Sequence, residues 1–211
     1  MSSKIYIIRH AESVHNITKD FSLRDPGLTP LGLTQASALA TTFPALSSIG
    51  VIITSPLRRT VETTLAAFGD VIGDGDGKGG VKVILESDLQ ERSDLPCDTG
   101  SETGVVKGWF EGVGVKGVDF SGLGEEWFDK GGRNKADDAS VAERARAVRE
   151  RLREVVKGLG GAEEGKRDVV VVTHGVFMKF LTGDEAIDLP KAGWRVYTLG
   201  EERGEVKLVE A

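Results

Sequence analysis

Two short apolar runs, each followed at once by polar residues, constrain the fold of this chain more than any other feature of its sequence. Ile5-Tyr6-Ile7-Ile8 stops at Arg9-His10, and Val169-Val170-Val171-Val172 stops at Thr173-His174. Neither run alternates apolar and polar residues, a pattern typical of strands buried on both faces of a parallel sheet. Reactive groups gather at the carboxyl ends of such strands. If the two strands are neighbours, His10 and His174 face one another across a single site.

The rest of the chain alternates expected helices with expected strands. Thr29-Pro30, Ser55-Pro56 and Ser140-Val141-Ala142-Glu143 each have the form of a helix N-terminus, and apolar residues at helical spacing follow each of them. The other expected elements are strands at 51–53 and 81–85, a helix at 176–181, and a hairpin of strands at 195–199 and 205–209. We expect the Arg and Glu residues of the helix that Ser140 opens to form a solvated face with ion pairs four residues apart. The alternation predicts a three-layer α/β/α sandwich with a mainly parallel central sheet.

Two stretches interrupt this alternation. The tract 69–80 is rich in Gly and Asp and is predicted to be a surface loop, because its Asp74-Gly75-Asp76-Gly77 lacks the bidentate Glu that a calcium loop requires. From Ser93 to Asp138 the periodicity fails, and so long a segment without regular elements is typical of a lid or binding loop. We therefore expect one domain over residues 1–211, with 93–138 as an insert that caps the site.

Composition excludes several classes of protein. The formal net charge of −6 argues against a nucleic-acid binder, whose affinity would come from a basic face. The single cysteine, Cys97, cannot form an intrachain disulfide, which favours a reducing compartment. Met1-Ser2-Ser3-Lys4 runs straight into the first strand, so neither a signal peptide nor a membrane span is expected. We expect a protein of the cytoplasm or the nucleus, and the sequence carries no signal of its oligomeric state.

The polar residues expected at the strand ends suit a phosphoryl group. They are Arg9, His10, Asn16, Arg59, Glu91 and His174. Arginine forks onto paired oxygens, while Asn and His donate further hydrogen bonds, and the helix after His174 adds a positive dipole end. With no metal-ligand spacing and no cysteine in these motifs, the best nucleophile is His10, and no metal or cofactor is expected. Glu91 is the carboxylate at a strand exit that would protonate the leaving alkoxide, after which water would hydrolyse the phosphohistidine.

Several residues near these positions leave alternatives open. His15 is interpreted as a pocket-wall residue that touches substrate, and Glu12 and Ser13 have comparable claims to substrate contact. Helix phase alone does not decide whether Arg58 or Arg59 faces inward, although an outward ion pair for Arg58 is favoured. The residues that compete with Glu91 for the acid role are Asp88, Arg92 and Asp94.

Arg9-His10-Ala11-Glu12-Ser13-Val14-His15-Asn16 resembles the R-H-G-x-x-x-x-N signature of the histidine phosphatase superfamily, the phosphoglycerate-mutase-like proteins. Three further blocks agree in order and spacing: Asp25-Pro26-Gly27-Leu28-Thr29-Pro30-Leu31-Gly32, Thr54-Ser55-Pro56-Leu57-Arg58-Arg59-Thr60 and Val172-Thr173-His174-Gly175. Leu89-Gln90-Glu91 and the stretch 94–100 are similar to a fungal branch of that family. The resemblance implies a phosphoglycerate-mutase-like fold and a phosphorylated nucleophile at His10. It also implies a phosphate pocket of Arg9, Asn16, Arg59 and His174, with Gly175 beside it, and a proton donor at Glu91.

The chain departs from the family pattern in ways that bear on its activity. Ala11 stands in place of the signature Gly, where we expect its methyl group to be tolerated in the turn of the nucleophile, and Lys179 stands where many members have Arg. Mutases of the family hold a second phosphate with a basic pair in the insert, whereas 93–138 has five Lys and Arg residues against ten Asp and Glu. We therefore expect a metal-independent phosphomonoesterase acting on a small phosphorylated metabolite. The alternatives are a mutase-type phosphotransferase and a non-catalytic phosphate-binding protein on the same fold.

Overall fold

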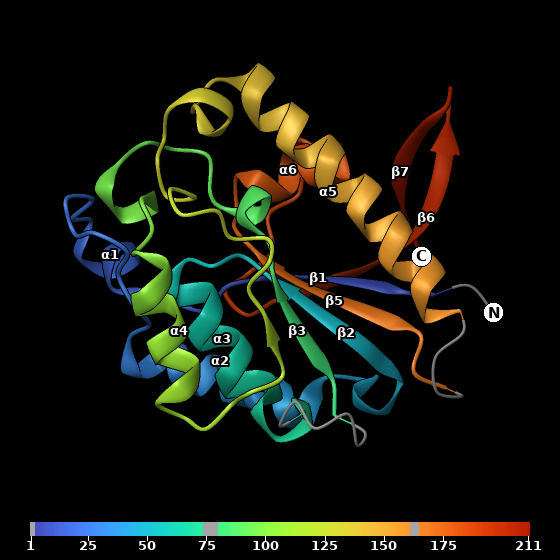
Figure 1. Cartoon of the computed structure of the whole chain (residues 1–211), viewed down its shortest axis with the longest axis horizontal. Coiled ribbons are helices and arrows are strands. Elements are labelled where there is room, and N and C mark those ends of the chain that lie inside the picture. The colour runs from blue at the N-terminus through green and yellow to red at the C-terminus, as the bar shows by residue number, and fades with distance from the viewer. Residues whose placement is uncertain (1–2, 74–79, 161–164) are drawn as a thin grey trace.

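The computed structural model describes residues 3–73, 80–160 and 165–211, and within them a seven-stranded sheet forms the centre of the molecule (Figure 1). Its strands, in spatial order, are β4 (Val118–Asp119), β3 (Lys82–Leu85), β2 (Ile49–Thr54), β5 (Asp168–Thr173), β1 (Ile5–Arg9), β6 (Trp194–Glu202) and β7 (Glu205–Glu210). The first five run parallel, and the β6–β7 hairpin joins the edge of β1 antiparallel. The prediction of a mainly parallel sheet is confirmed.

Helices cover both faces of this sheet (Figure 1). One face packs against α2 (Pro30–Thr42), α3 (Arg58–Phe68) and α4 (Thr103–Glu111), and the other against α5 (Asp138–Leu159) and α6 (Phe177–Thr182). The side chains of β1 alternate between the two cores, with Tyr6 and Ile8 in one and Ile5 and Ile7 in the other. The predicted three-layer α/β/α sandwich is confirmed. None of the helices in the described ranges is long and apolar enough to cross a bilayer.

Short helical turns complete the chain. The α-helix α1 (Val14–Thr18) follows β1, and 3₁₀ turns lie at Leu46–Ser48, Gly69–Val71, Ser87–Leu89, Pro96–Asp98 and Gly132–Asn134. The sequence does not predict α1, because its five residues are too few to show a helical period. The interpretation of Asp74-Gly75-Asp76-Gly77 lies outside the described residues.

The two histidine strands are direct neighbours. β1 and β5 pair in parallel, with Ile8 opposite Val172 and Arg9 opposite Thr173. The pairing continues one residue further, because the His10 N–H donates to the Thr173 carbonyl at 2.9 Å. Both strands therefore end at the same level of the sheet, and they deliver His10 and His174 to one edge.

Two helices begin at other residues than the sequence predicts. α3 starts at Arg58 rather than at Pro56, and its first N–H donates 2.8 Å to the carboxylate of Asp25, a residue distant in sequence. Ser55 lies instead in the turn after β2. α5 starts at Asp138 with Asp137 as its N-cap, so the capping box expected at Ser140 is wrong. The Ser140 N–H is itself a donor to Asp137, at 3.0 Å.

Arg144 contradicts the prediction that the Arg and Glu residues of α5 form a solvated face. Arg144 is fully buried, donates to the carbonyls of Asp88 and Gln90 at 2.9 Å, and lies over the ring of Phe177. It therefore ties α5 to the segment that carries Glu91. The ion pairs within α5 between residues three apart are Arg153–Glu150 and Lys157–Glu154, whereas the sequence predicts pairs four apart.

The segment 93–138 contains more regular structure than the sequence predicts. Val106 and Phe110 of α4 are fully buried in the core that also holds Ile8, and β4 extends the sheet beyond β3. The helical period is hard to see in the sequence because α4 has only nine residues, of which two are glycines. Much of the segment is thus part of the sandwich, and its beginning, at 93–98, contributes to the pocket described below. The extent of the domain and the role of this segment as a cap stay predictions.

Candidate active site

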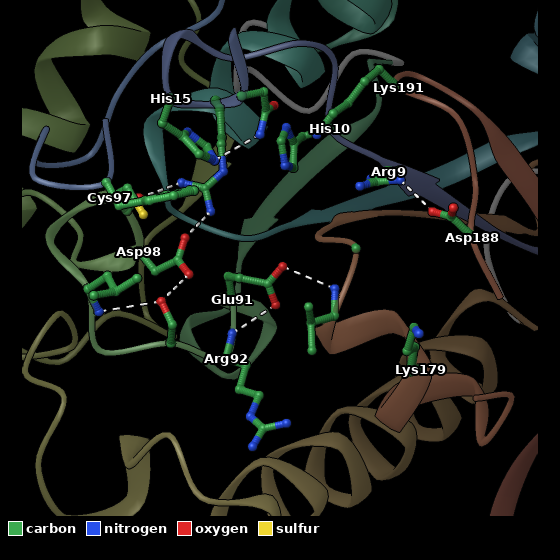
Figure 2. Close-up of a pocket in the computed structure, with 17 residues that line it drawn as sticks. Arg9, His10, His15, Glu91, Arg92, Cys97, Asp98, Lys179, Asp188 and Lys191 are labelled. Carbon is green, nitrogen blue, oxygen red and sulfur yellow. Dashed lines mark hydrogen bonds and ion pairs between the residues drawn. The ribbon is translucent and has the colours of Figure 1, made fainter. Parts of the chain in front are cut away.

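A pocket of about 510 Å³ lies at the carboxyl ends of β1 and β5 (Figure 2). The described residues that line it are Arg9, His10, His15, Asn16, Phe21, Arg59, Glu91, Arg92, Ser93, Leu95, Cys97, Asp98, Gly175, Val176, Lys179, Asp188 and Lys191. Most of the residues expected in the site are among them. Glu12, Ser13 and His174 are not among these lining residues.

His10 and His174 lie side by side, with ring centroids 5.2 Å apart. His10 Nδ1 is 2.7 Å from the carbonyl of Ala11, so this nitrogen carries the hydrogen and Nε2 keeps its lone pair. His174 Nε2 is 2.9 Å from Ser55 Oγ, while Nδ1 is buried without a partner in the described part of the chain. Ala11 is accommodated in the apolar core, and its N–H donates 3.0 Å to Thr63 Oγ1.

Both imidazoles are held in the neutral form. Burial lowers the pKa of His10 well below its usual value, and the nearby charges of Arg59 and Lys191 lower it further. The pKa of His174 is also lowered well below its usual value, first by burial and then by Arg59. Each ring therefore stays uncharged into mildly acidic solution.

Arg59 reaches the pocket from the first turn of α3. It is 1% exposed, donates 2.7 Å to the Cys97 carbonyl and pairs at 2.8 Å with the buried carboxylate of Asp98. Asp98 in turn accepts a hydrogen bond of 2.6 Å from Ser93 Oγ. Arg58 points away and pairs with Glu62 at 2.7 Å. Of the two adjacent arginines, Arg59 therefore lines the pocket and Arg58 does not.

Arg9 enters from the opposite side, at the end of β1. Its guanidinium pairs with Asp188 at 2.9 Å (Figure 2). It also donates to the Leu189 carbonyl. A Cβ at Gly175 would lie 2.9 Å from this guanidinium, so a side chain there would displace Arg9. Gly175 is therefore needed for the close approach of Arg9 to the turn after His174.

Asn16, His15 and Ser13 form one hydrogen-bonded group. Asn16 Nδ2 is 3.0 Å from His15 Nε2, and His15 Nδ1 is 3.0 Å from Ser13 Oγ. Ser13 Oγ donates onward to the Pro26 carbonyl at 3.2 Å. Ser13 is fully buried and is not among the lining residues, so it supports the pocket wall, and its contact with substrate stays a prediction.

The Glu91 carboxylate faces the pocket and is fixed by backbone donors. It accepts from the N–H groups of Val176 (3.1 Å) and Phe177 (2.9 Å) at the start of α6, and from that of Arg92 (2.8 Å). Its own carbonyl accepts from Lys130 Nζ at 3.3 Å. The start of α6, which the sequence predicts to face a phosphate, is thus occupied by Glu91.

The carboxylates that compete with Glu91 lie elsewhere. Asp88 pairs with Arg133, and Asp94 lines a separate hollow with Glu126 and Asp129. Glu12 accepts from Thr29 Oγ1 at 2.7 Å, beside the start of α2. Glu91, Asp98 and Asp188 are therefore the carboxylates of the described residues that line this pocket together with His10.

Sequence reasoning missed three charged residues of the site, Asp98, Lys191 and the Arg9 partner Asp188. Asp98 lies in an irregular stretch, where its pairing with Arg59 carries no local signal. Lys191 follows Pro190 in the loop before β6, and burial and the charge of Arg9 lower its pKa to about 8. No motif points to Lys191, although its place shortly before a strand that pairs with β1 could have raised it as a candidate. Among the described residues, no group of three or more His, Cys, Asp or Glu side chains is arranged to hold a metal ion.

Comparison with known proteins is consistent with this geometry. The model of the histidine phosphatase superfamily (branch 1) matches residues 5–97 and 115–209. A Schizosaccharomyces pombe protein named as a probable phosphatase is 30% identical over 197 residues, which are 89% of this chain and 83% of that protein. A phosphoglycerate mutase-like protein of Arabidopsis thaliana is 36% identical over 104 residues, 44% of this chain. The latter alignment spans 37% of the Arabidopsis protein, so the two share only part of their lengths.

The fold is also similar to solved structures. A mycobacterial glucosyl-3-phosphoglycerate phosphatase superposes with a TM-score of 0.61 at 20% identity, over 99% of this chain and 97% of that one. At this identity the likeness concerns the fold and leaves the substrate open.

Proposed function

The chain belongs to the histidine phosphatase superfamily, and we propose that it is a metal-independent phosphomonoesterase that works through a phosphohistidine at His10. The substrate is a small phosphorylated metabolite, and the enzyme is a histidine phosphatase of the acid type that acts in the cytoplasm or the nucleus. One observation carries the proposal: the rings of His10 and His174 lie 5.2 Å apart at a pocket whose wall contains Arg59.

In the first step, His10 Nε2 attacks phosphorus in line with the ester oxygen, and the N–P bond forms as the P–O bond breaks. The hydrogen bond from Nδ1 to Ala11 directs the lone pair to Nε2. The lowered pKa of His10 keeps that lone pair free at mildly acidic pH. The protonated carboxyl group of Glu91 gives its proton to the leaving alkoxide.

In the second step, water attacks phosphorus and the N–P bond breaks. The Glu91 carboxylate accepts the proton of this water, which returns Glu91 to its protonated form. His10 becomes neutral again and inorganic phosphate leaves. One proton donor that acts in both directions is enough for the cycle.

The charge of the transferring phosphoryl group is balanced by both walls of the pocket. Arg59 and Arg9 approach from opposite sides, and Lys191 adds a third cation. The unpartnered Nδ1 of His174 is a further donor for a phosphoryl oxygen if Ser55 Oγ–H donates to Nε2. Asn16 keeps one amide hydrogen for the same purpose after its bond to His15.

The first test is hydrolysis of p-nitrophenyl phosphate in EDTA at mildly acidic pH. We expect the parent to release nitrophenol and His10→Ala to lose activity by about 10³-fold or more, because the nucleophile is gone. Arg58→Ala, outside the pocket, is the matched control and should retain the parental rate. Equal rates for parent and His10→Ala, or release by neither, would favour a non-catalytic phosphate-binding protein.

A second test concerns the intermediate. Acid-labile, alkali-stable phosphate should be trapped on the parent in a rapid quench, and His174→Ala should form it poorly. Abundant label in His174→Ala would contradict the role assigned to His174. A coupled assay for phosphoglycerate mutase, with and without bisphosphoglycerate, tests the phosphotransferase alternative.

A further inference from the structure

One wall of the pocket is apolar and aromatic. The ring of His15 lies 6.4 Å from that of His10 and 6.3 Å from that of Phe21, so the three rings form a row. The row leads outward, because His10 and His15 are buried while Phe21 is 46% exposed. Leu95, equally exposed, lines the same pocket from the segment 93–98. Phe21 and Leu95 are large apolar side chains that lack cover at the mouth of this pocket.

The hydrogen bonds around His15 fix one neutral tautomer. The Ser13 N–H donates 3.1 Å to Asn16 Oδ1, which orients the amide so that its NH₂ group faces His15. His15 Nε2 must then accept, and Nδ1–H donates to Ser13 Oγ, whose own hydrogen goes to Pro26. A proton added at Nε2 would meet the amide hydrogens of Asn16. Burial and the charge of Arg59 act in the same direction and lower the pKa of His15 to about 4.

His15 is therefore a neutral ring whose two nitrogens already have partners. It offers no charge to a phosphate, and its remaining contact surface is the face of the ring. The cations of the pocket that have no carboxylate partner in the described part of the chain, Lys179 and Lys191, come instead from α6 and the loop before β6. Phosphoryl oxygens would thus meet the cations and Asn16 in the interior of the pocket, whereas an apolar alcohol would lie further out, against Phe21 and Leu95.

We propose that the wall of His15, Phe21 and Leu95 selects phosphomonoesters with an apolar, preferably aromatic, alcohol over esters of small polar alcohols. This inference rests on the proposed phosphatase activity and adds the substrate class to it. His15 has a second, separate role as a positioning residue, because its Nε2 holds the amide of Asn16.

The test compares two primary alkyl esters, 2-phenylethyl phosphate and 2-hydroxyethyl phosphate, by release of inorganic phosphate. We expect the parent to prefer the phenylethyl ester in kcat/KM by about 10-fold, and Phe21→Ala to reduce that ratio by about 3- to 10-fold, the range of one aromatic contact. Leu33→Ala is the control, since Leu33 is as exposed as Phe21 (47%) but lines a different groove. A ratio that is the same in the parent and Phe21→Ala, or a preference for the hydroxyethyl ester, would overturn the proposal.

Two substitutions separate the roles of His15. His15→Phe keeps a ring but removes the acceptor of Asn16, so kcat/KM should fall by about 5-fold or more for both esters while their ratio is kept. His15→Gln keeps an acceptor near the position of Nε2 but removes the ring, so the ratio itself should fall. A fall in the ratio of the two esters in His15→Phe, with the ratio kept in His15→Gln, would contradict the two roles assigned to His15.

A binding experiment separates this proposal from the proposed activity. If the parent hydrolyses neither these esters nor p-nitrophenyl phosphate, the phosphatase proposal fails, and calorimetric titration with 2-phenylethylphosphonate and ethylphosphonate still tests the wall. Several-fold tighter binding of the phenyl compound, lost in Phe21→Ala, would support the wall as a binding surface. Equal affinities for the two phosphonates would exclude a wall that binds apolar alcohols.

Discussion

The two arginines of the pocket are held by carboxylates in opposite environments. Arg59 and Asp98 are 1% and 9% exposed in their side chains, whereas Arg9 and Asp188 are 22% and 85% exposed. A buried charge left without its partner is costly, whereas an exposed pair contributes little to stability. One side of the pocket is thus fixed by the fold, while the other can adjust to what binds.

The neighbours of each pair extend this contrast. On the fixed side, Asp98 is also bound by Ser93, and Arg59 also donates to a backbone carbonyl. On the adjustable side, burial and the charge of Arg9 lower the pKa of Lys191 to about 8. Four experiments, in decreasing order of expected effect, test the distinction between the two sides.

Asp98→Ala should have the largest effect on stability. It leaves the guanidinium of Arg59 buried without its partner, so the free energy of unfolding should fall by about 3–5 kcal/mol. Urea unfolding measures the change. Asp98→Asn keeps an acceptor for Arg59 and should lose less. If Asp98→Ala lowers the free energy of unfolding by less than about 1 kcal/mol, the Arg59–Asp98 pair does not fix this side of the pocket.

The second-largest expected effect is a loss of folding stability in acid, caused by the three buried histidines beside Arg59. The folded-state pKa values of His10, His15 and His174 are all lowered, so the unfolded chain binds protons first. Stability is therefore full above about pH 6.5 and falls as the pH drops below it. His15 alone, with a pKa of about 4, should account for a loss on the order of 1–2 kcal/mol between pH 7 and pH 5. His15→Phe should show a smaller loss by urea unfolding at the two pH values.

Alkali should affect the adjustable side. The pKa of Lys191 is about 8, so its charge, and with it part of the phosphate affinity, should disappear as the pH rises through 8. We expect KM for p-nitrophenyl phosphate to rise about 5-fold, close to 1 kcal/mol, with little change in unfolding free energy. Lys191→Arg should move this rise to higher pH. A KM that does not change between pH 7 and pH 9 in the parent would exclude a role for Lys191.

Asp188→Ala should have the smallest effect. Its carboxylate is solvated, so the loss in unfolding free energy should stay below about 1 kcal/mol. Arg58→Ala, which removes the exposed pair with Glu62, gives the scale for a helix-surface pair at about 0.3–0.5 kcal/mol. A loss for Asp188→Ala as large as that for Asp98→Ala would remove the difference between the two sides.

The central sheet and the strand-end positions of its two histidines follow from the sequence. Each apolar run must be buried on both faces, so the pattern of residues places His10 and His174 at strand ends on one edge of the sheet. That β1 and β5 are direct neighbours, which brings the two rings together, is shown only by the structure. The alternation of elements likewise predicts the three layers. These inferences hold because the burial of an apolar strand can be predicted from its own residues, without knowledge of the segments that pack against it.

The ionic contacts of the site, by contrast, depend on the tertiary structure. Arg58 and Arg59 are adjacent and chemically alike, and the carboxylate of Asp98 and the carbonyl of Cys97 hold the second in the pocket wall. The sequence places Arg144 on the surface, because nothing in its helix shows the carbonyls of Asp88 and Gln90 that it binds. A charged side chain is long and takes its place from partners distant in sequence, so its burial depends on the assembled fold rather than on its own segment.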